Sequence, residues 1–247
     1  MPASAFLLAA RVASLNLCTD EYLLLLARPD EVASVSYLSQ DPLESPLWRL
    51  GRRFHGNYGS FEQVLKTRPE VLLTMGGGGR ASGLLAERMG VRTVELQFVT
   101  RPADVAVNLS RVATALGDPR RAAPWIRRLK ALEASRPASA RDAIFLSGGG
   151  QSFSSGGAGE AWLRLAGLSQ RSLAGGRVSL ETLLVKPPQI LVQSNYRRRQ
   201  VSTDTIWLNH PIVRGLKARR IASDGRVWTC MGPTVIPEVE RLRKLAQ

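Results

Sequence analysis

The chain has 247 residues, of which 44% are hydrophobic and 22% are charged, as is typical of a folded protein with a substantial core. This length fits one large domain or two small lobes. No stretch approaches the roughly 18 uninterrupted apolar residues of a membrane-spanning helix. Two cysteines and two histidines are too few for a disulfide scaffold or a four-thiolate zinc site.

The net charge is +14, from 34 basic and 20 acidic residues. Such a charge suits an anionic partner, whether nucleic acid, membrane surface or acidic ligand, and it also fits an arginine-biased proteome. The basic residues are spread along the chain and are not interleaved with aromatic residues, as they are in single-strand binders. We therefore expect no nucleic-acid partner.

The first ten residues, MPASAFLLAA, are apolar and end in small residues. They lack the positive start and the length of a complete secretory signal. We interpret residues 1–10 as the remnant of a signal peptide, with a short disordered leader as the alternative. A secreted protein would fold in an oxidising compartment, where a disulfide between Cys18 and Cys230 becomes possible.

The first part of the chain alternates strands and helices. Short apolar runs bounded by proline or glycine favour buried strands, and a glycine after an amphipathic run favours a helix end. The predicted strands are 11–17, 32–38, 71–75 and 91–96, and the predicted helices are 19–27, 61–65 and 84–89.

Two helical segments follow, at 102–116 and 120–134, each with apolar residues at helical spacing. Gly117 to Pro119 separates them, and residues 135–140 form a linker of small residues. Strand and helix alternation then resumes. The predicted strands are 142–147, 190–193 and 226–229, the predicted helices are 160–166, 180–184 and 234–246, a Gly- and Ser-rich loop spans 148–159, and 209–211 form a turn.

The two halves contain a repeat. SFEQVL at 60–65 matches SLETLL at 179–184, and PEVLL at 69–73 matches PQILV at 188–192, with an offset of 119 residues and no gap. Chance similarity of two helix–proline–strand units is the alternative. The shared glutamate, proline and apolar pattern favour a true repeat and hence two α/β lobes.

Several segments together resemble class III periplasmic binding proteins, which serve ABC importers of vitamin B12, ferric siderophores and haem. Their order and spacing match over nearly the whole chain after residue 10. The segments that carry the resemblance are RVASLNLCTDEYLLLLARPDEVASVSYLSQDP, SFEQVLKTRPEVLLT, GDPRRAA, GEAWLRLAGL, VSLETLLVKPPQILV, NHPIVRGL and RVWTCMGPTVIPEVERL.

The resemblance implies an α/β fold in which two small lobes with central sheets are joined by one long bridging helix, with the ligand in the cleft between them. It places an N-terminal lobe at 11–100, a bridging helical segment at 101–134 and a C-terminal lobe at 141–247. It implies a monomeric, non-enzymatic periplasmic protein that captures a metal chelate of cobalamin, ferric siderophore or haem type. The protein would deliver that ligand to the permease dimer of an ABC importer at the membrane, with no intrinsic cofactor, any iron or cobalt belonging to the ligand.

In such folds the ligand lies at the carboxyl ends of the strands. Tyrosine, phenylalanine and methionine there would supply flat or soft apolar contacts for a macrocycle or chelate. Some of the candidates would be ordinary core or loop residues, and we expect about half to contact ligand. The predicted ligand-binding residues are Asn16, Cys18, Thr19, Tyr37, Leu38, Met75, Gly76, Phe153, Asn195, Tyr196, Arg197, Cys230 and Met231.

Glu62 and Glu181 occupy matching positions of the repeat. The resemblance implies that one acidic residue on each lobe docks into basic pockets of the permease dimer. Two carboxylates related by pseudo-symmetry suit a two-fold partner. Both would also complement a helix macrodipole, and Ser60 and Ser179 would fit a capping role beside them.

The cysteines and one arginine cluster leave alternatives open. Cys18 and Cys230 could form a disulfide across the cleft, ligate a metal centre in the ligand as free thiols, or be inert thiols. The run from Arg197 to Arg199 could contact an anionic ligand or lie in a solvated loop.

Two other functions stay open. One is a ligand sensor or scavenger on the same fold, and the other is an enzyme with a cleft thiol. The sequence has no G-x-S-x-G elbow, H-E-x-x-H, P-loop or G-x-G-x-x-G motif, which disfavours the enzyme.

Overall fold

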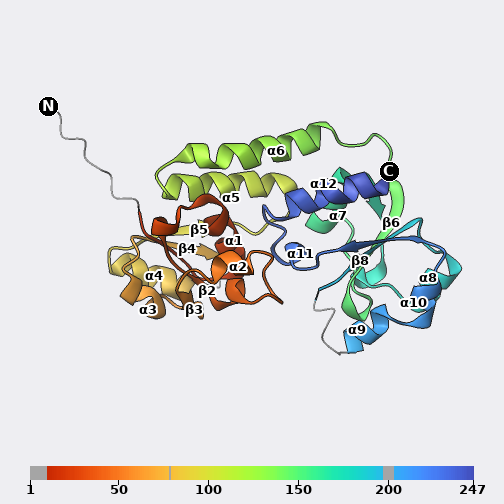
Figure 1. Cartoon of the computed structure of the whole chain (residues 1–247), viewed down its shortest axis with the longest axis horizontal. Coiled ribbons are helices and arrows are strands. Elements are labelled where there is room, and N and C mark those ends of the chain that lie inside the picture. The colour runs from red at the N-terminus through yellow and green to blue at the C-terminus, as the bar shows by residue number, and fades with distance from the viewer. Residues whose placement is uncertain (1–9, 78, 197–202) are drawn as a thin grey trace. The chain divides into compact units, whose positions relative to one another are not determined.

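The computed structural model describes residues 10–77, 79–196 and 203–247 (Figure 1). The chain divides into two compact units. The first comprises the chain up to Phe98 together with Ala106–Ile126, and the second comprises Val99–Val105 and Arg127–Gln247. The chain therefore passes from one unit to the other three times.

The segment predicted to bridge the lobes contains two helices, α5 (Pro102–Ala115) and α6 (Ala123–Ala134), each with residues in both units. It is not the single long helix that the resemblance implied. Gly117, at φ 78°, follows α5, and the 3-10 turn η4 (Pro119–Ala122) precedes α6. Asp118 accepts a bond from the backbone N–H of Arg120 and so caps that turn.

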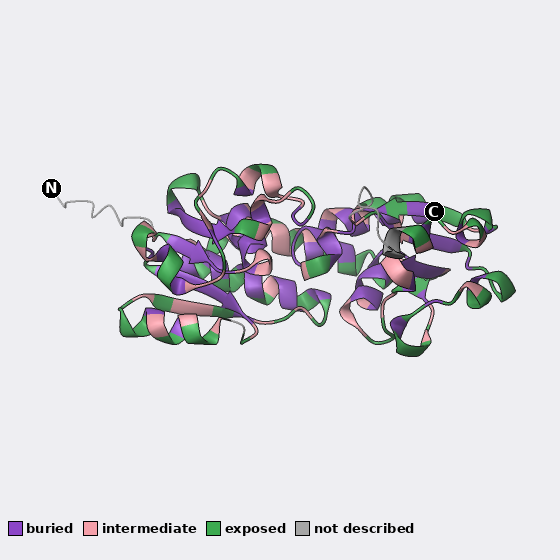
Figure 2. Cartoon of the chain, turned by 90° about the horizontal axis from the view of Figure 1, so that it is seen from below, coloured by how far each residue is buried: buried purple, intermediate pink, exposed green. Residues whose placement is uncertain are grey.

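The first unit is built on a parallel sheet of five strands. Every residue of β1, β2 and β4 is buried (Figure 2), because helices cover both faces of a parallel sheet. In sheet order the strands are β3 (Gly56–Asn57), β2 (Val32–Ser36), β1 (Val12–Ser14), β4 (Val71–Met75) and β5 (Arg92–Leu96). The helices are α1 (Leu17–Leu26), α2 (Trp48–Gly51), α3 (Phe61–Val64) and α4 (Arg80–Arg88), with 3-10 turns η1 (Pro29–Glu31), η2 (Tyr37–Gln40) and η3 (Leu65–Thr67).

The second unit is built on a parallel sheet of four strands. Its core packs Ile144 and Leu146 of the sheet against Leu183 and Val213 of two helices. In sheet order the strands are β7 (Leu168–Gln170), β6 (Arg141–Leu146), β8 (Ile190–Ser194) and β9 (Arg219–Ser223). The helices are α7 (Ala158–Leu165), α8 (Leu180–Val185), α9 (Thr203–Leu208), α10 (Pro211–Gly215), α11 (Val227–Cys230) and α12 (Val235–Ala246), with 3-10 turns η5 (Gly148–Gly150) and η6 (Ala174–Gly176).

The predicted repeat corresponds to matching elements. Helices α3 and α8 begin at Phe61 and Leu180, and β4 and β8 cover 71–75 and 190–194, again 119 residues apart. The sheet orders β2-β1-β4-β5 and β7-β6-β8-β9 place the repeated strand at the same position in each unit. The two units are therefore two copies of one α/β plan.

One predicted element near the C-terminus is wrong. Residues 226–229 are not a strand, since Val227–Cys230 form the short helix α11 and the last strand is β9. A turn at Asp224 and Gly225 separates them, where Asp224 Oδ1 accepts a bond from the Arg226 N–H. Within the described part of the chain, no helix is long and apolar enough to cross a membrane.

Candidate ligand-binding site

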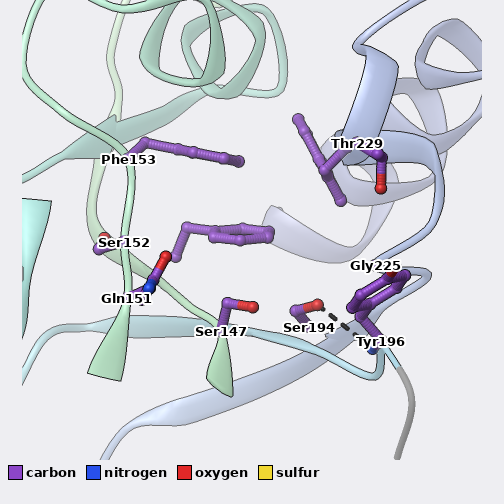
Figure 3. A pocket seen from close by; sticks show the side chains of 10 residues that line it. Ser147, Gln151, Ser152, Phe153, Ser194, Tyr196, Gly225 and Thr229 are labelled. Atoms are coloured by element: carbon purple, nitrogen blue, oxygen red, sulfur yellow. Dashed lines mark hydrogen bonds between the residues drawn. The ribbon is translucent and has the colours of Figure 1, made fainter. Parts of the chain in front are cut away.

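A pocket of about 240 Å³ lies in the second unit, at the carboxyl ends of three of its strands (Figure 3). Its walls come from the end of β6 and the loop that follows, the end of β8, and the turn that joins β9 to α11. The lining residues are Phe145, Ser147, Gln151, Ser152, Phe153, Ser194, Tyr196, Gly225, Trp228 and Thr229.

Three aromatic rings form one wall of the pocket. Phe145 and Phe153 are stacked, with ring centroids 4.0 Å apart and planes 16° apart. Trp228 lies 5.3 Å from both. Its indole N–H donates to Ser223 Oγ at 2.7 Å, and that hydroxyl donates to Glu238 at 2.6 Å. Because the indole is held by this buried chain of hydrogen bonds, the aromatic wall is rigid.

Two glycines shape this wall. A Cβ at Gly159 would lie 2.3 Å from the ring of Phe153, so a side chain there would push the ring out of the stack. Gly150 has φ 76°, and a Cβ would lie 2.7 Å from the carbonyl oxygen of Val178. Only glycine adopts this geometry without strain, which explains the Gly-rich loop directly after β6.

The rest of the lining is polar and uncharged. Ser194 Oγ accepts a bond from the backbone N–H of Tyr196 at 3.3 Å, and Ser152 Oγ accepts one from Gln170 at 3.0 Å. None of the ten lining residues is an acid or a base. Since buried charge requires a partner, this pocket suits an apolar or aromatic group that carries neutral hydrogen-bonding atoms.

The carboxyl edge of the first sheet also presents aromatic side chains. Tyr37 follows β2 and Tyr58 follows β3, with ring centroids 4.9 Å apart and exposed fractions of 46% and 74%. Phe98, 62% exposed, follows β5 and covers Gly76, where a Cβ would lie 2.0 Å from its ring. All three exposed aromatic side chains of the described residues therefore lie at one sheet edge. The sequence prediction included Tyr37 and missed Tyr58 and Phe98.

The loop between β1 and α1 holds structural residues. Asn16 caps α1, because its Oδ1 accepts bonds from the N–H groups of Cys18 and Thr19 at 3.1 and 3.0 Å. Thr19 is fully buried, 2.6 Å from Ser14 Oγ, and donates to the Asn16 carbonyl. The structure corrects the prediction for Thr19, whose side chain has no surface to offer a ligand.

Four further candidates have varied surroundings. Leu38 is half-buried in η2, and Met75 is only 8% exposed at the end of β4. Asn195 Oδ1 accepts a bond from the Gly225 N–H at 3.1 Å and so fixes the turn beside the pocket. Met231 has φ 50°, a left-handed conformation that is rare outside glycine. Among the predicted residues, Phe153 and Tyr196 line the pocket, and Arg197 lies outside the described residues.

Both cysteines are disulfide-bonded, and neither is a free thiol. The two thiol alternatives, a metal-ligating pair and an inert pair, therefore do not apply, and neither does an enzyme with a cleft thiol. Cys230 is the last residue of helix α11. The sequence had predicted instead that Cys230 directly follows a strand. Within the described ranges, no group of three or more His, Cys, Asp or Glu residues could hold a metal ion.

The two repeat glutamates are exposed on short helices. Ser179 caps α8 by accepting a bond from the Thr182 N–H at 3.1 Å, whereas Ser60 makes no such cap. The pKa of Glu62 and that of Glu181 lie below the usual value, because each carboxylate accepts hydrogen bonds from its own backbone N–H and from the preceding serine. Both side chains are thus ionised at neutral pH.

No protein family model matches the chain, and no curated protein matches it. Solved structures do. The periplasmic heme-binding protein HutB of Vibrio cholerae shares 17% identity at a TM-score of 0.74, covering 96% of this chain and 98% of its own. The apo form of the periplasmic heme-binding protein RhuT from Roseiflexus sp. RS-1 shares 19% identity at a TM-score of 0.71, and the match covers 97% of this chain and 100% of RhuT. The siderophore-binding protein BauB, bound to a complex between two molecules of acinetobactin and ferric iron, shares 16% identity at a TM-score of 0.72. That match covers 97% of this chain and 93% of BauB.

The chain has the fold of periplasmic binding proteins. These identities are low, so the likeness extends to the fold and not to a particular ligand. The neighbours named here are binding proteins and not enzymes.

Proposed function

We propose that this chain is the periplasmic substrate-binding protein of an ABC importer and that it captures a metal chelate of haem, ferric siderophore or cobalamin type. The observation that carries the proposal is the aromatic character of both sheet edges. The second unit offers the wall of Phe145, Phe153 and Trp228, and the first offers Tyr37 and Tyr58. Flat rings bind flat conjugated ligands by stacking and by burial of apolar area.

The polar lining favours a ligand whose bound face is neutral. Serine, threonine and glutamine side chains donate to and accept from carbonyl, hydroxyl or amide groups without an ionic partner. Two of the structural neighbours are named for heme and a third binds a ferric siderophore complex. Any metal would enter as part of this ligand, coordinated by the chelate.

The first experiment measures binding directly. Hemin, ferric enterobactin and cyanocobalamin are titrated into the purified protein while tryptophan fluorescence and visible absorbance are recorded. Trp228 lies in the pocket, whereas Trp48 lies on α2 with the guanidinium groups of Arg49 and Arg52 each 4.6 Å from its ring. We expect saturable quenching by one probe that is strongly reduced in Trp228→Phe and preserved in the control Trp48→Phe.

Two results would contradict this proposal. One is the absence of saturable binding for all three probes, followed by native mass spectrometry of protein purified from its own cells that shows no bound chelate. The other is equal quenching in the Trp228→Phe and wild-type proteins, which would place the ligand away from the aromatic wall.

Delivery to a permease is the second part of the proposal. Ionised Glu62 and Glu181 sit at equivalent positions of the repeat and are exposed, which suits a two-fold partner with basic docking sites. We expect the double variant Glu62→Lys and Glu181→Lys to bind ligand normally but to lose uptake through its importer. The exposed controls Glu87→Lys and Glu133→Lys should transport normally. Full uptake by the double variant would remove docking from the proposal and favour a sensor or scavenger.

A further inference from the structure

A second cavity, of about 490 Å³, opens in the second unit at the carboxyl ends of β8 and β9. It adjoins the pocket with the aromatic wall, because Ser194 lines both. Two of its described lining residues are arginines and none is an acid, so we call this cavity the arginine pocket. The described lining residues are Gln193, Ser194, Asn195, Leu208, Asn209, Arg214, Arg220 and Ala222.

The pleat of the sheet places the two pockets on opposite faces. Leu191 of β8 pairs in register with Arg220 of β9, and the next residue of β8, Val192, pairs with Phe145 of β6. Successive residues of a strand point to opposite faces, so Arg220 shares a face with Leu191, and the ring of Phe145 lies on the other face. A ligand that reaches both pockets therefore straddles the end of β8.

The arginine pocket exists because β9 is the edge strand of its sheet. Leu208 of α9 and Val213 of α10 pack in the core that contains Leu191 of the neighbouring strand β8. On β9 itself, Arg220 is exposed, whereas Ile221 on the opposite face is buried. The two helices thus cover the inner strands of this face and leave the face of β9 open beside α10.

Two guanidinium groups line this space without an acid to balance them. Arg220 Nη2 donates to the backbone carbonyl of Arg214, which holds the two residues together. Within the described ranges, that is the one hydrogen bond that either guanidinium makes, and neither takes part in an ion pair. Arg226, in the turn after β9, differs because it pairs with Asp224 at 2.6 Å. The arginine pocket is therefore a cationic compartment beside a neutral one.

The chemistry of this lining matches an anion. A guanidinium is always protonated, and its N–H donors form a planar fork that fits the two oxygens of a carboxylate. Charge-assisted hydrogen bonds of this kind are about twice as strong as neutral ones. The side-chain amides of Asn195 and Asn209 add neutral hydrogen-bonding groups to the same wall.

We propose that the arginine pocket binds a carboxylate of the ligand, so that the chelate carried by this protein is a conjugated molecule with an acidic arm. The flat neutral part enters the pocket with the aromatic wall, and the arm passes the end of β8 to Arg214 and Arg220. The identity of the molecule that bears the acid rests on the proposed function, whereas the anion site itself does not. Among the probes above, hemin fits this description through its free propionates, whereas the corrin ring of cyanocobalamin carries amides.

The first test compares hemin with hemin dimethyl ester, in which the same acids are uncharged. Both are titrated into the protein while tryptophan fluorescence is recorded. We expect hemin to bind the wild type roughly ten-fold more tightly than the ester, as one charge-assisted contact implies. Arg220→Gln and Arg214→Gln should each weaken hemin binding toward that of the ester and leave ester binding unchanged. The control Arg219→Gln removes the same charge from an exposed neighbour on β9 that does not line the pocket, and it should keep the preference for hemin.

The second test needs no chelate. The Nε–H signals of the arginine side chains are followed by NMR as citrate is added at constant ionic strength, with assignments from the three variants. We expect saturable shifts at Arg214 and Arg220 and none at Arg219. Such shifts in a protein that binds no chelate would support the anion site and count against the proposed function. Equal binding of hemin and its ester, unaffected by Arg220→Gln, would overturn the acidic arm and leave the proposed function standing. Citrate shifts that are absent, or equal at Arg219, would overturn the anion site.

Discussion

The ion pair between Glu31 and Arg121 gives the sharpest test of how the first unit is assembled. The Glu31 side chain has no exposed surface, and its oxygens accept bonds from Arg121 Nη1 at 2.5 Å and Nη2 at 2.9 Å. Arg28 adds a backbone bond at 2.7 Å and an ion pair at 2.8 Å. The pair ties η4, between the two long helices, to η1, which directly precedes strand β2.

Replacing Arg121 by methionine leaves Glu31 buried with Arg28, which is 56% exposed, as its cationic partner. Breaking a buried pair from one side costs about 3–5 kcal/mol, because the remaining charge loses solvent and partner together. Since Arg28 persists, we expect a loss near the lower value, about 3 kcal/mol in the free energy of unfolding. Urea denaturation followed by tryptophan fluorescence measures it as a lower midpoint at an unchanged slope.

The double variant Glu31→Met with Arg121→Met provides the control for this reasoning. With both charges replaced by apolar side chains, stability should return to within about 1 kcal/mol of the wild type. Arg120→Ala, at a side chain that is 91% exposed, should cause no measurable change. A double variant as unstable as Arg121→Met, or an Arg121→Met variant as stable as the wild type, would refute the argument.

Three further outcomes are expected. Phe153→Ala removes the ring stacked in the pocket and should weaken hemin binding roughly five-fold, as measured by quenching, for about 1 kcal/mol of aromatic contact. Intact mass spectrometry of the unreduced protein should show that Cys18 and Cys230 have lost two hydrogen atoms, and reduction should lower the free energy of unfolding by up to about 5 kcal/mol, since the loop spans roughly 200 residues. The pKa of Asp20 rises on folding from 3.8 to about 7, so its stabilising contribution is complete below pH 4 and is lost as the pH rises to 7. Relative to Asp20→Asn, the wild type should lose about 4 kcal/mol of unfolding free energy over that range in urea titrations.

Sequence patterns were reliable where a segment is apolar along its whole length. Residues 71–75 are all buried in β4 as predicted, because a parallel strand covered on both faces needs apolar side chains at every position. The repeat then located β8 and its short helix. The same logic fails for β9, where the segment RRIAS buries only alternate residues, and for β3, which has two residues.

The binding edge was harder to predict, because exposure depends on the rest of the fold. Tyr58 follows a strand too short to recognise, and Phe98 stays exposed since it lies across the bare backbone of Gly76. Phe145 was predicted to lie inside a strand, and its side chain is indeed buried. It also lines the pocket, as one of the three rings of the aromatic wall. Thr19 follows a strand, as a ligand-facing residue would, but it turns inward to bond Ser14. The position of a residue along a strand thus predicts whether it lies at the carboxyl edge of the sheet. Whether its side chain points outward or into the core depends on the packing of the whole fold.

The two units share a strand order and differ in how their edges are held, and this difference bears on how a ligand would be captured. In the second unit, Trp228 is fixed through Ser223 to Glu238, so its wall is formed before a ligand arrives. In the first unit, the rings of Tyr37 and Tyr58 are exposed and lie against each other. A rigid wall binds with little loss of conformational entropy, whereas exposed rings can adjust to ligands of different outline. The two units therefore share one strand plan and differ in how firmly their aromatic side chains are held.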